Sequence, residues 1–69
     1  MLGLKAARER RGLTQTQLAY HTGSYATAIS RWENGHAGCQ LGTAVRIAKF
    51  LEVSLDYLVF GSEKEGGHE

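Results

Sequence analysis

The sequence predicts an all-α fold, in which five short helices form one compact domain at residues 1–60. Its apolar residues recur at spacings of three and four, as in helices packed on one side, and no stretch alternates as a strand would. Glycines and capping residues divide the chain into short segments. The remaining residues, 61–69, read GSEKEGGHE and contain no apolar side chain, so a disordered polar tail is expected there.

The first three helices are expected at residues 4–11, 15–22 and 26–33. Gly12 ends the first of them. Thr14 and Gln17 have the spacing of a capping box, in which each side chain bonds the backbone N–H of the other residue. Gly23 falls where the chain must reverse, a left-handed position that glycine adopts without a steric penalty. These signals predict two helices joined by a tight turn.

A fourth helix is expected after a loop of helix-breaking residues, NGHAGCQ at 34–40. Its apolar stripe has helical spacing over Leu41, Ala44, Val45, Ala48 and Leu51. Ser54 is expected to cap a short fifth helix. The expected core gathers apolar positions from all five helices and their connections: Leu4, Ala7, Leu13, Leu18, Ala19, Ile29, Trp32, Leu41, Ala44, Val45, Ala48, Leu51, Val53, Leu55 and Leu58.

Composition restricts the setting in which the protein works. The single cysteine, Cys39, rules out an internal disulfide and favours a reducing compartment, so a cytoplasmic protein is expected. The chain shows no signal peptide and no apolar run of membrane-spanning length, so no membrane partner is expected. Residues 1–60 carry seven Lys and Arg against four Asp and Glu, a net charge of +3, while 61–69 carry −2. The small positive charge of residues 1–60 predicts a modest attraction of each monomer to phosphate and a need for dimerisation.

No group of residues in the sequence suggests catalysis. A Ser-His-Asp set, paired carboxylates and a glycine-rich phosphate loop are all missing, so we expect neither an enzyme nor a cofactor. Five short helices leave little room for a small-molecule pocket. His36 and Cys39 have the spacing H-x-x-C, but two ligands do not make a zinc site, so no metal is expected. A redox or metal sensor is the minor alternative.

The functional signal lies in residues 14–35, TQTQLAYHTGSYATAISRWENG. Ile29 and Trp32 are spaced to bury one stripe of the third helix. The opposite face holds short or hydrogen-bonding side chains with no apolar stripe among them: Ala26, Thr27, Ser30, Arg31 and Asn34. A helix with such a face fits the major groove of DNA.

The segment resembles the helix-turn-helix of the lambda-repressor-like, Cro-type family of transcriptional regulators, often called XRE. The family pattern T-Q-x-x-L-A-x-x-x-G followed by I-S-x-W-E-x-G is matched by Thr14, Gln15, Leu18, Ala19, Gly23, Ile29, Ser30, Trp32, Glu33 and Gly35. The resemblance extends over residues 4–58 and implies a five-helix DNA-binding domain, with the helix-turn-helix at the second and third helices. It also implies an ion pair between Arg8 and Glu33 that fixes the turn presenting Asn34 and Gly35 to phosphate. The alternative is that this pair has a purely structural role.

The resemblance implies two kinds of DNA contact. The positions that match the base-contacting residues of the family, together with their neighbour Ser30, are Tyr25, Ala26, Thr27, Ser30 and Arg31. Phosphate contacts are implied for Gln15, Asn34, Gly35 and His36. The glutamine at the position of Gln15 can also brace a side chain of the recognition helix.

Two of these residues keep open alternatives. Arg31 can pair bidentately with guanine, a contact worth about 1–3 kcal/mol of discrimination, or it can bind phosphate. Tyr25 departs from the small polar residue usual in the family. Its side chain is expected either to contact the DNA backbone or to cover the turn.

Cys39 stands where the family often has a proline, so the loop before the fourth helix is expected to be looser than usual.

The implied function is sequence-specific regulation of transcription on double-stranded DNA. A homodimer acting as a repressor would place two recognition helices about 34 Å apart on a pseudo-palindromic operator. Tyr57, Val59 and Phe60 are the expected dimer interface, although Val59 and Phe60 could instead pack against the first helix of their own chain. The rival function is a protein-interaction module, such as an antitoxin that neutralises a partner, against which the short polar tail argues.

Overall fold

Five α-helices account for most of residues 1–36 and 38–62, the part of the chain that the computed structural model describes. They are α1 (Leu4–Arg10), α2 (Gln15–Thr22), α3 (Ala26–Glu33), α4 (Leu41–Leu51) and α5 (Leu55–Phe60). No strand occurs within these residues. The five expected helices are confirmed, and the first ends one residue earlier than expected. The expected tail lies outside the described residues from residue 63 onward.

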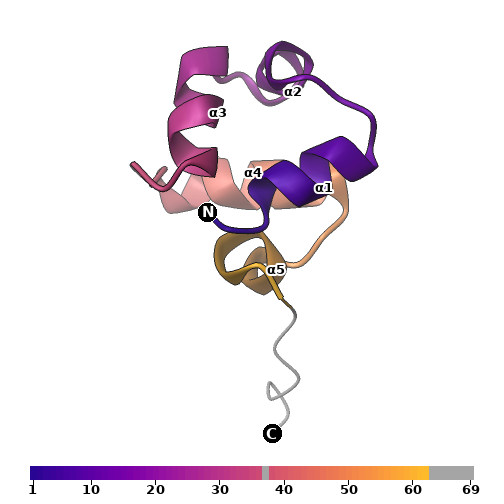
Figure 1. Ribbon diagram of the computed structural model, residues 1–69, viewed down its shortest axis with the longest axis vertical. Helices are drawn as coiled ribbons and strands as arrows, with labels where there is room; N and C mark the ends of the chain where they lie inside the picture. The colour runs from indigo at the N-terminus through magenta and orange to yellow at the C-terminus, as the bar shows by residue number, and fades with distance from the viewer. Residues whose placement is uncertain (37, 63–69) are drawn as a thin grey trace, which may run out of the picture.

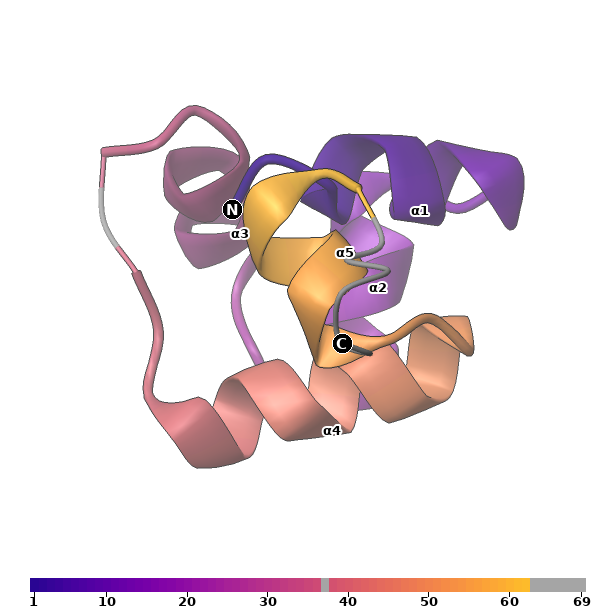
Figure 2. The same ribbon diagram turned by 90° about the horizontal axis from the view of Figure 1, so that it is seen from below.

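The helices pack around a core to which all five contribute (Figures 1 and 2). Helix α2 packs against α3 and α4, and α4 packs against α5. Helix α1 contacts both α3 and α5, and it lies on the side of the domain opposite α4 (Figure 2). Helices α2 and α3 therefore lie at one end of the molecule and α5 at the opposite end (Figure 1). None of the helices in the described part of the chain has the length and hydrophobicity to cross a membrane.

Local capping fixes the ends of α2 and the start of α5. The Thr14 hydroxyl accepts from the Gln17 N–H at 3.0 Å, and the Gln17 side chain accepts from the Thr14 N–H at 2.9 Å. Gly23 follows α2 with φ of 70°, in the left-handed region, so the chain turns directly toward α3. Ser54 accepts from the Tyr57 N–H at 3.0 Å at the start of α5. The expected capping residues are confirmed.

The buried apolar side chains come from each of the five helices: Leu4, Ala7, Leu18, Ala19, Ile29, Ala44, Ile47, Ala48, Leu51 and Leu58. Two expected core residues lie outside the core: Leu41 is 68% exposed, and Val45 is half-buried without packing against the core cluster. Ile47, which was not expected in the core, is fully buried. The buried stripe of α4 thus begins one turn later than expected. Leu41 is the first residue of α4, at the end that lies farthest from α5 (Figure 2).

The N-terminal segment, residues 1–3, joins the ends of α3 and α5. The N–H groups of Leu2 and Gly3 donate to the carbonyls of Val59 and Leu58, at 3.1 and 3.0 Å. These carbonyls belong to the last turn of α5, where no intrahelical donor remains. The amino group of Met1 donates to the Trp32 carbonyl at 2.9 Å, near the end of α3. The first three residues are therefore part of the packed domain.

Candidate nucleic-acid interface

Helix α3 has one buried side and one open side. Ile29 is fully buried and Trp32 is half-buried, and both pack toward the core. Thr27 and Arg31 are exposed, and they lie one helical turn apart on the same face. Ala26 and Ser30 are half-buried along the edges of that face. A helix with exposed polar groups in this arrangement can present them to base edges.

Tyr25 immediately precedes α3 and extends into solvent. Its backbone is extended, with φ of −118° and ψ of 146°, and its side chain makes no capping hydrogen bond. The residue is 78% exposed. The ring therefore does not cover the turn, which was one of the two expected roles.

The turn after α3 uses its own backbone N–H groups internally. Those of Asn34, Gly35 and His36 donate to carbonyls of α3, at distances of 3.0 to 3.3 Å. Gly35 has φ of 77°, in the left-handed region, which lets the chain close this turn. The side chains of Asn34 and His36 are exposed. A phosphate contact expected from Gly35 would have to come from its backbone N–H, which already donates to the Trp32 carbonyl. Phosphate contacts from this turn would therefore come from side chains.

The start of α2 keeps backbone donors available. The Gln17 N–H is taken by the Thr14 hydroxyl and the Leu18 N–H by the Thr14 carbonyl. The N–H groups of Gln15 and Thr16 precede these bonds, in the first turn, where a helix has no acceptor of its own. Together with the positive end of the helix dipole, they can bind an anion.

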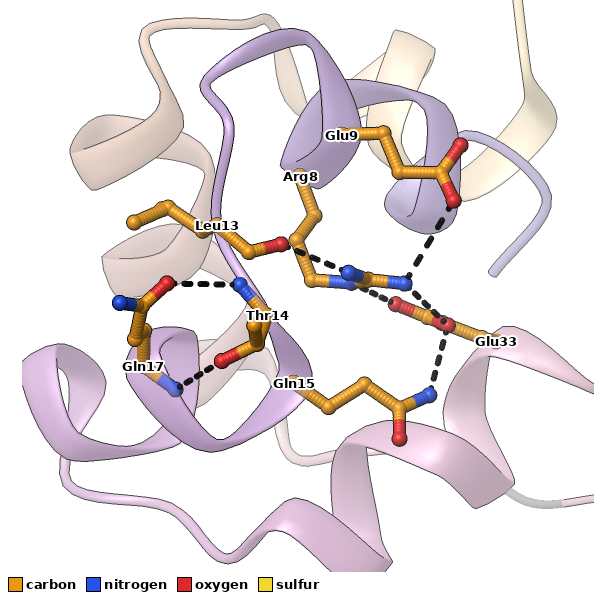
Figure 3. A network of polar contacts seen from close by, with 7 residues as sticks. All are labelled: Arg8, Glu9, Leu13, Thr14, Gln15, Gln17 and Glu33. Atoms are coloured by element: carbon orange, nitrogen blue, oxygen red, sulfur yellow. Dashed lines mark hydrogen bonds and ion pairs between the residues drawn. The ribbon is translucent and has the colours of Figure 1, made fainter.

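A buried polar network holds these two regions together (Figure 3). The Nε of Arg8 lies 2.6 Å from Oε2 of Glu33, and its Nη2 lies 3.2 Å from Oε1 of the same carboxylate. The third nitrogen, Nη1, donates to the Leu13 carbonyl at 2.7 Å. The hydrogen bond to Glu33 raises the pKa of Arg8 above its usual value, against the opposing effect of burial. The network ties α1 to the end of α3.

Gln15 also joins this network. Its Nε2 donates to Oε1 of Glu33 at 2.9 Å, across 18 residues of sequence (Figure 3). The side chain expected to contact phosphate is therefore directed at the carboxylate that ends α3.

Other arginines are held by aromatic rings or helix ends. Arg10 lies over the ring of Tyr57, 5.4 Å from its centroid. Arg11 donates to the Phe50 carbonyl at 3.1 Å, and Arg46 donates to the Thr22 carbonyl at 3.2 Å at the end of α2. Sequence reasoning assigned no role to Arg46, because its spacing gives no sign of a partner 24 residues earlier. Arg31 thus remains the exposed cation on the open face of α3.

The residues expected in the dimer interface differ in exposure. Phe60 is 57% exposed, whereas Tyr57 and Val59 are half-buried. Tyr57 packs against the core. The N-terminal segment bonds the Val59 carbonyl, and it brings the exposed Leu2 beside the end of α5.

Cys39 is half-buried, and its sulfur lies 3.8 Å from that of Met1. Burial raises the pKa of the Cys39 thiol. Among the described residues, no three His, Cys, Asp or Glu side chains gather as a metal site would require.

A family model described as helix-turn-helix matches residues 4–58 of this chain. The chain belongs to the Cro/C1-type helix-turn-helix family. Among curated proteins, this helix-turn-helix domain is 38% identical over 60 residues to the HTH-type transcriptional activator BcrR of Enterococcus faecalis. It is 36% identical over 62 residues to YqaE of Bacillus subtilis (strain 168), an uncharacterised HTH-type transcriptional regulator.

These two alignments cover 87% and 90% of this chain, but only 29% of the length of BcrR and 53% of that of YqaE. Among solved structures, the domain matches the P22 c2 repressor protein in complex with the synthetic operator 9T in the presence of Tl⁺. The TM-score is 0.79 with 29% identity, over 86% of this chain and 89% of the other. The lambda-repressor-like fold is thereby confirmed.

Proposed function

We propose that this member of the Cro/C1-type family binds a pseudo-palindromic operator as a homodimer and represses transcription there. The observation that carries the proposal is the open face of α3, where Thr27 and Arg31 are exposed while Ile29 anchors the opposite side in the core. The P22 c2 repressor, which shares the fold, has been solved in complex with an operator. Helix α3 would enter the major groove.

Base reading is assigned to the face of α3 and its start. Arg31 pairs bidentately with O6 and N7 of guanine. The Thr27 methyl and Ala26 pack against a thymine methyl, and Ser30 bonds a neighbouring base edge. Tyr25, which extends from the start of α3, contacts the flank of the same half-site.

Phosphate binding is assigned to both ends of the helix-turn-helix. The N–H groups of Gln15 and Thr16 hold one phosphate at the start of α2. The exposed side chains of Asn34 and His36 hold another, on a turn that Gly35 shapes. Contacts of this kind fix the register of the protein on the duplex without reading sequence.

The homodimer is assigned to the end of α5, where Tyr57, Val59 and Phe60 lie, with Leu2 added beside them. A net charge of +3 on residues 1–60 supplies limited attraction to DNA. Joining two copies doubles the phosphate contacts, and affinity rises with their number. The repressor assignment rests on the likeness to the P22 c2 repressor. A dimer on an operator that overlaps a promoter would exclude polymerase.

Operator selection from random duplexes tests this function. Wild type should yield a two-fold symmetric site, and Arg31→Ala should lose its preference at one base pair in each half-site, by a factor corresponding to about 1–3 kcal/mol. Lys49→Ala removes an exposed charge from α4 and is the matched control, which should select the same site. A uniform loss across all sequences in Arg31→Ala would show that Arg31 binds phosphate, and a wild type without sequence preference would reject the function.

A further inference from the structure

The two ends of α3 are held by different parts of the molecule. Its last residue, Glu33, is held from α1 through the 2.6 Å contact with Arg8. Its start follows a turn at residues 22–25, and helix α4 contacts the chain where this turn begins. The residues of α4 that make these contacts have no part in the function proposed above.

Helix α4 holds the last turn of α2 at two consecutive residues. Arg46 Nε donates to the Thr22 carbonyl at 3.2 Å. That carbonyl lies at the end of α2, where no intrahelical donor remains and a positive charge is favourable. The ring of Phe50 stacks on that of His21, with 4.9 Å between the centroids and 20° between the planes. Arg46 and Phe50 are one turn apart on α4, so both contacts come from one face of that helix.

The turn itself is built on the residues that α4 holds. The N–H groups of Gly23 and Ser24 both donate to the Ala19 carbonyl, that of Ser24 at 2.9 Å. Thr22 is buried, and its hydroxyl donates to the Leu18 carbonyl at 2.8 Å. Helix α3 begins only two residues after Ser24. The way in which α4 holds the end of α2 therefore fixes where α3 starts.

We infer that Arg46 is a positioning residue for base reading and that it acts without touching DNA. By holding the Thr22 carbonyl, it places the start of α3, which carries the methyl group of Thr27. The buried network around Glu33 holds the opposite end of the helix, beyond Arg31. This inference rests on the proposed function, because it concerns how the two ends of the same base-reading helix are aligned.

Separate supports predict separate losses of specificity. Without the Arg46 contact, the start of α3 should shift while its end stays in place. The preference for thymine opposite Thr27 should then fall, whereas the preference for guanine opposite Arg31 should persist. A phosphate contact, or a general loss of stability, would instead lower affinity for every sequence alike.

Operator selection scored at each base pair tests this difference. Thr27→Ser, which removes one methyl group, and Arg31→Ala first identify the base pair that each residue reads. Arg46→Met keeps an unbranched apolar side chain but removes the charge and the donors. It should lower the preference at the Thr27 base pair by about fivefold, the scale of one hydrogen bond, and change that at the Arg31 base pair by less than about twofold.

Arg46→Lys keeps the charge and a donor, so it should restore part of the preference that Arg46→Met loses. A uniform loss at all base pairs in Arg46→Met, or an unchanged preference at the Thr27 base pair, would overturn the inference.

Lys49→Met is the matched control. It removes one positive charge from an exposed position of α4, about one turn after Arg46, so it reproduces any effect of that charge on attraction to DNA. Its selected site should equal that of wild type. The same shift as in Arg46→Met would overturn the inference, because the charge of α4 would then set the preference without the bond to Thr22.

Amide hydrogen exchange gives a second readout that needs no DNA. In Arg46→Met, Gly23 and Ser24 should exchange about fivefold faster than in wild type, while Asn34 and Gly35 after α3 keep their rates. Unchanged rates in the turn, or an equal rise at all four amides, would overturn the inference. A wild type without sequence preference rejects the proposed function, and these rates then still decide whether Arg46 holds the turn.

Discussion

Arg8 and Glu33 lie 25 residues apart and meet with an Nε–Oε2 distance of 2.6 Å, where both side chains are almost closed to solvent. The pair joins a helix outside the helix-turn-helix to the last residue of its second helix. The position of α3 is therefore set by α1 as well as by its packing against α2. The proposed DNA-binding surface therefore depends on residues that need not touch DNA.

Removing one member of this pair should destabilise the domain strongly. Glu33→Gln leaves the Arg8 charge buried without its partner, and we expect a loss of about 3–5 kcal/mol in the free energy of unfolding. Urea denaturation measures it. Glu9 is the matched control: its carboxylate lies 4.0 Å from Arg8 Nη2 and its side chain is 57% exposed, so Glu9→Gln should change stability by under about 0.5 kcal/mol. Equal losses in the two variants would contradict the role of the buried pair.

The capping box at the start of α2 should be measurable in the same way. Thr14→Ala removes the acceptor of the Gln17 N–H, and a loss of about 1 kcal/mol is expected. Thr16→Ala makes the same chemical change two residues later, at an exposed helical position, and should not lower stability. If Thr16→Ala proved the more damaging variant, the cap would not be what holds this end of α2.

Replacement of glycine by alanine should have opposite effects on stability at two positions. A Cβ at Gly3 would lie 2.0 Å from the Tyr57 carbonyl oxygen, so Gly3→Ala should cost about 1–3 kcal/mol by forcing the N-terminal segment off α5. A Cβ at Gly42, in the first turn of α4, meets nothing within 4 Å. Gly42→Ala should therefore raise stability by about 0.5–1 kcal/mol. Thermal unfolding of both variants checks the pair, and a stable Gly3→Ala protein would argue against this docking.

The position of the buried stripe on α4 can be tested with two aliphatic residues. Ile47→Ala removes a fully buried side chain and should cost about 2–5 kcal/mol. Leu41→Ala removes an exposed one, and its effect should stay within about 0.5 kcal/mol. Chemical denaturation ranks the two. A larger loss in Leu41→Ala than in Ile47→Ala would mean that Leu41 belongs to the buried stripe of α4, as the sequence predicted.

The thiol of Cys39 gives the fold a pH dependence on the alkaline side. Burial raises its pKa, so the folded protein holds the thiol proton more tightly than the unfolded chain does. The associated stability is complete below the pKa of the unfolded chain and is lost as pH rises through the folded pKa. Alkylation by iodoacetamide should show a higher midpoint pH for the folded protein than for the protein in urea. Coincident midpoints would show that the site does not bury the thiol.

The helices could be predicted because residues close to each boundary determine where a helix starts or ends. Thr14 with Gln17, Gly23 and Ser54 each act over a few positions, so sequence spacing alone locates the starts and ends. The register of α4 could not be found in this way. Leu41 and Ile47 both continue an apolar pattern, and only the positions of the neighbouring helices decide which of them is covered.

The open face of α3 could also be predicted, because Ile29 and Trp32 identify the side that is anchored. Among the contacts between distant residues, the Arg8–Glu33 pair was predicted, from the family resemblance, and the others were not. The spacing of residues does not show that Arg46 reaches the Thr22 carbonyl, or that residues 1–3 dock on α5. The turn after α3 belongs to the same group, because its N–H groups are used by carbonyls one turn back, a pattern that composition does not specify.

The docking of residues 2 and 3 on the last turn of α5 has a consequence for the dynamics of the domain. Helix α5 has only six residues, and it is retained by the packing of Leu55, Tyr57 and Leu58 on the core and by these two backbone bonds. The N-terminal segment and the helix should therefore detach together, as one cooperative unit that opens before the rest. Amide hydrogen exchange at Leu2, Gly3 and Leu58 should then proceed at a common rate, faster than at Ile29 and Ile47.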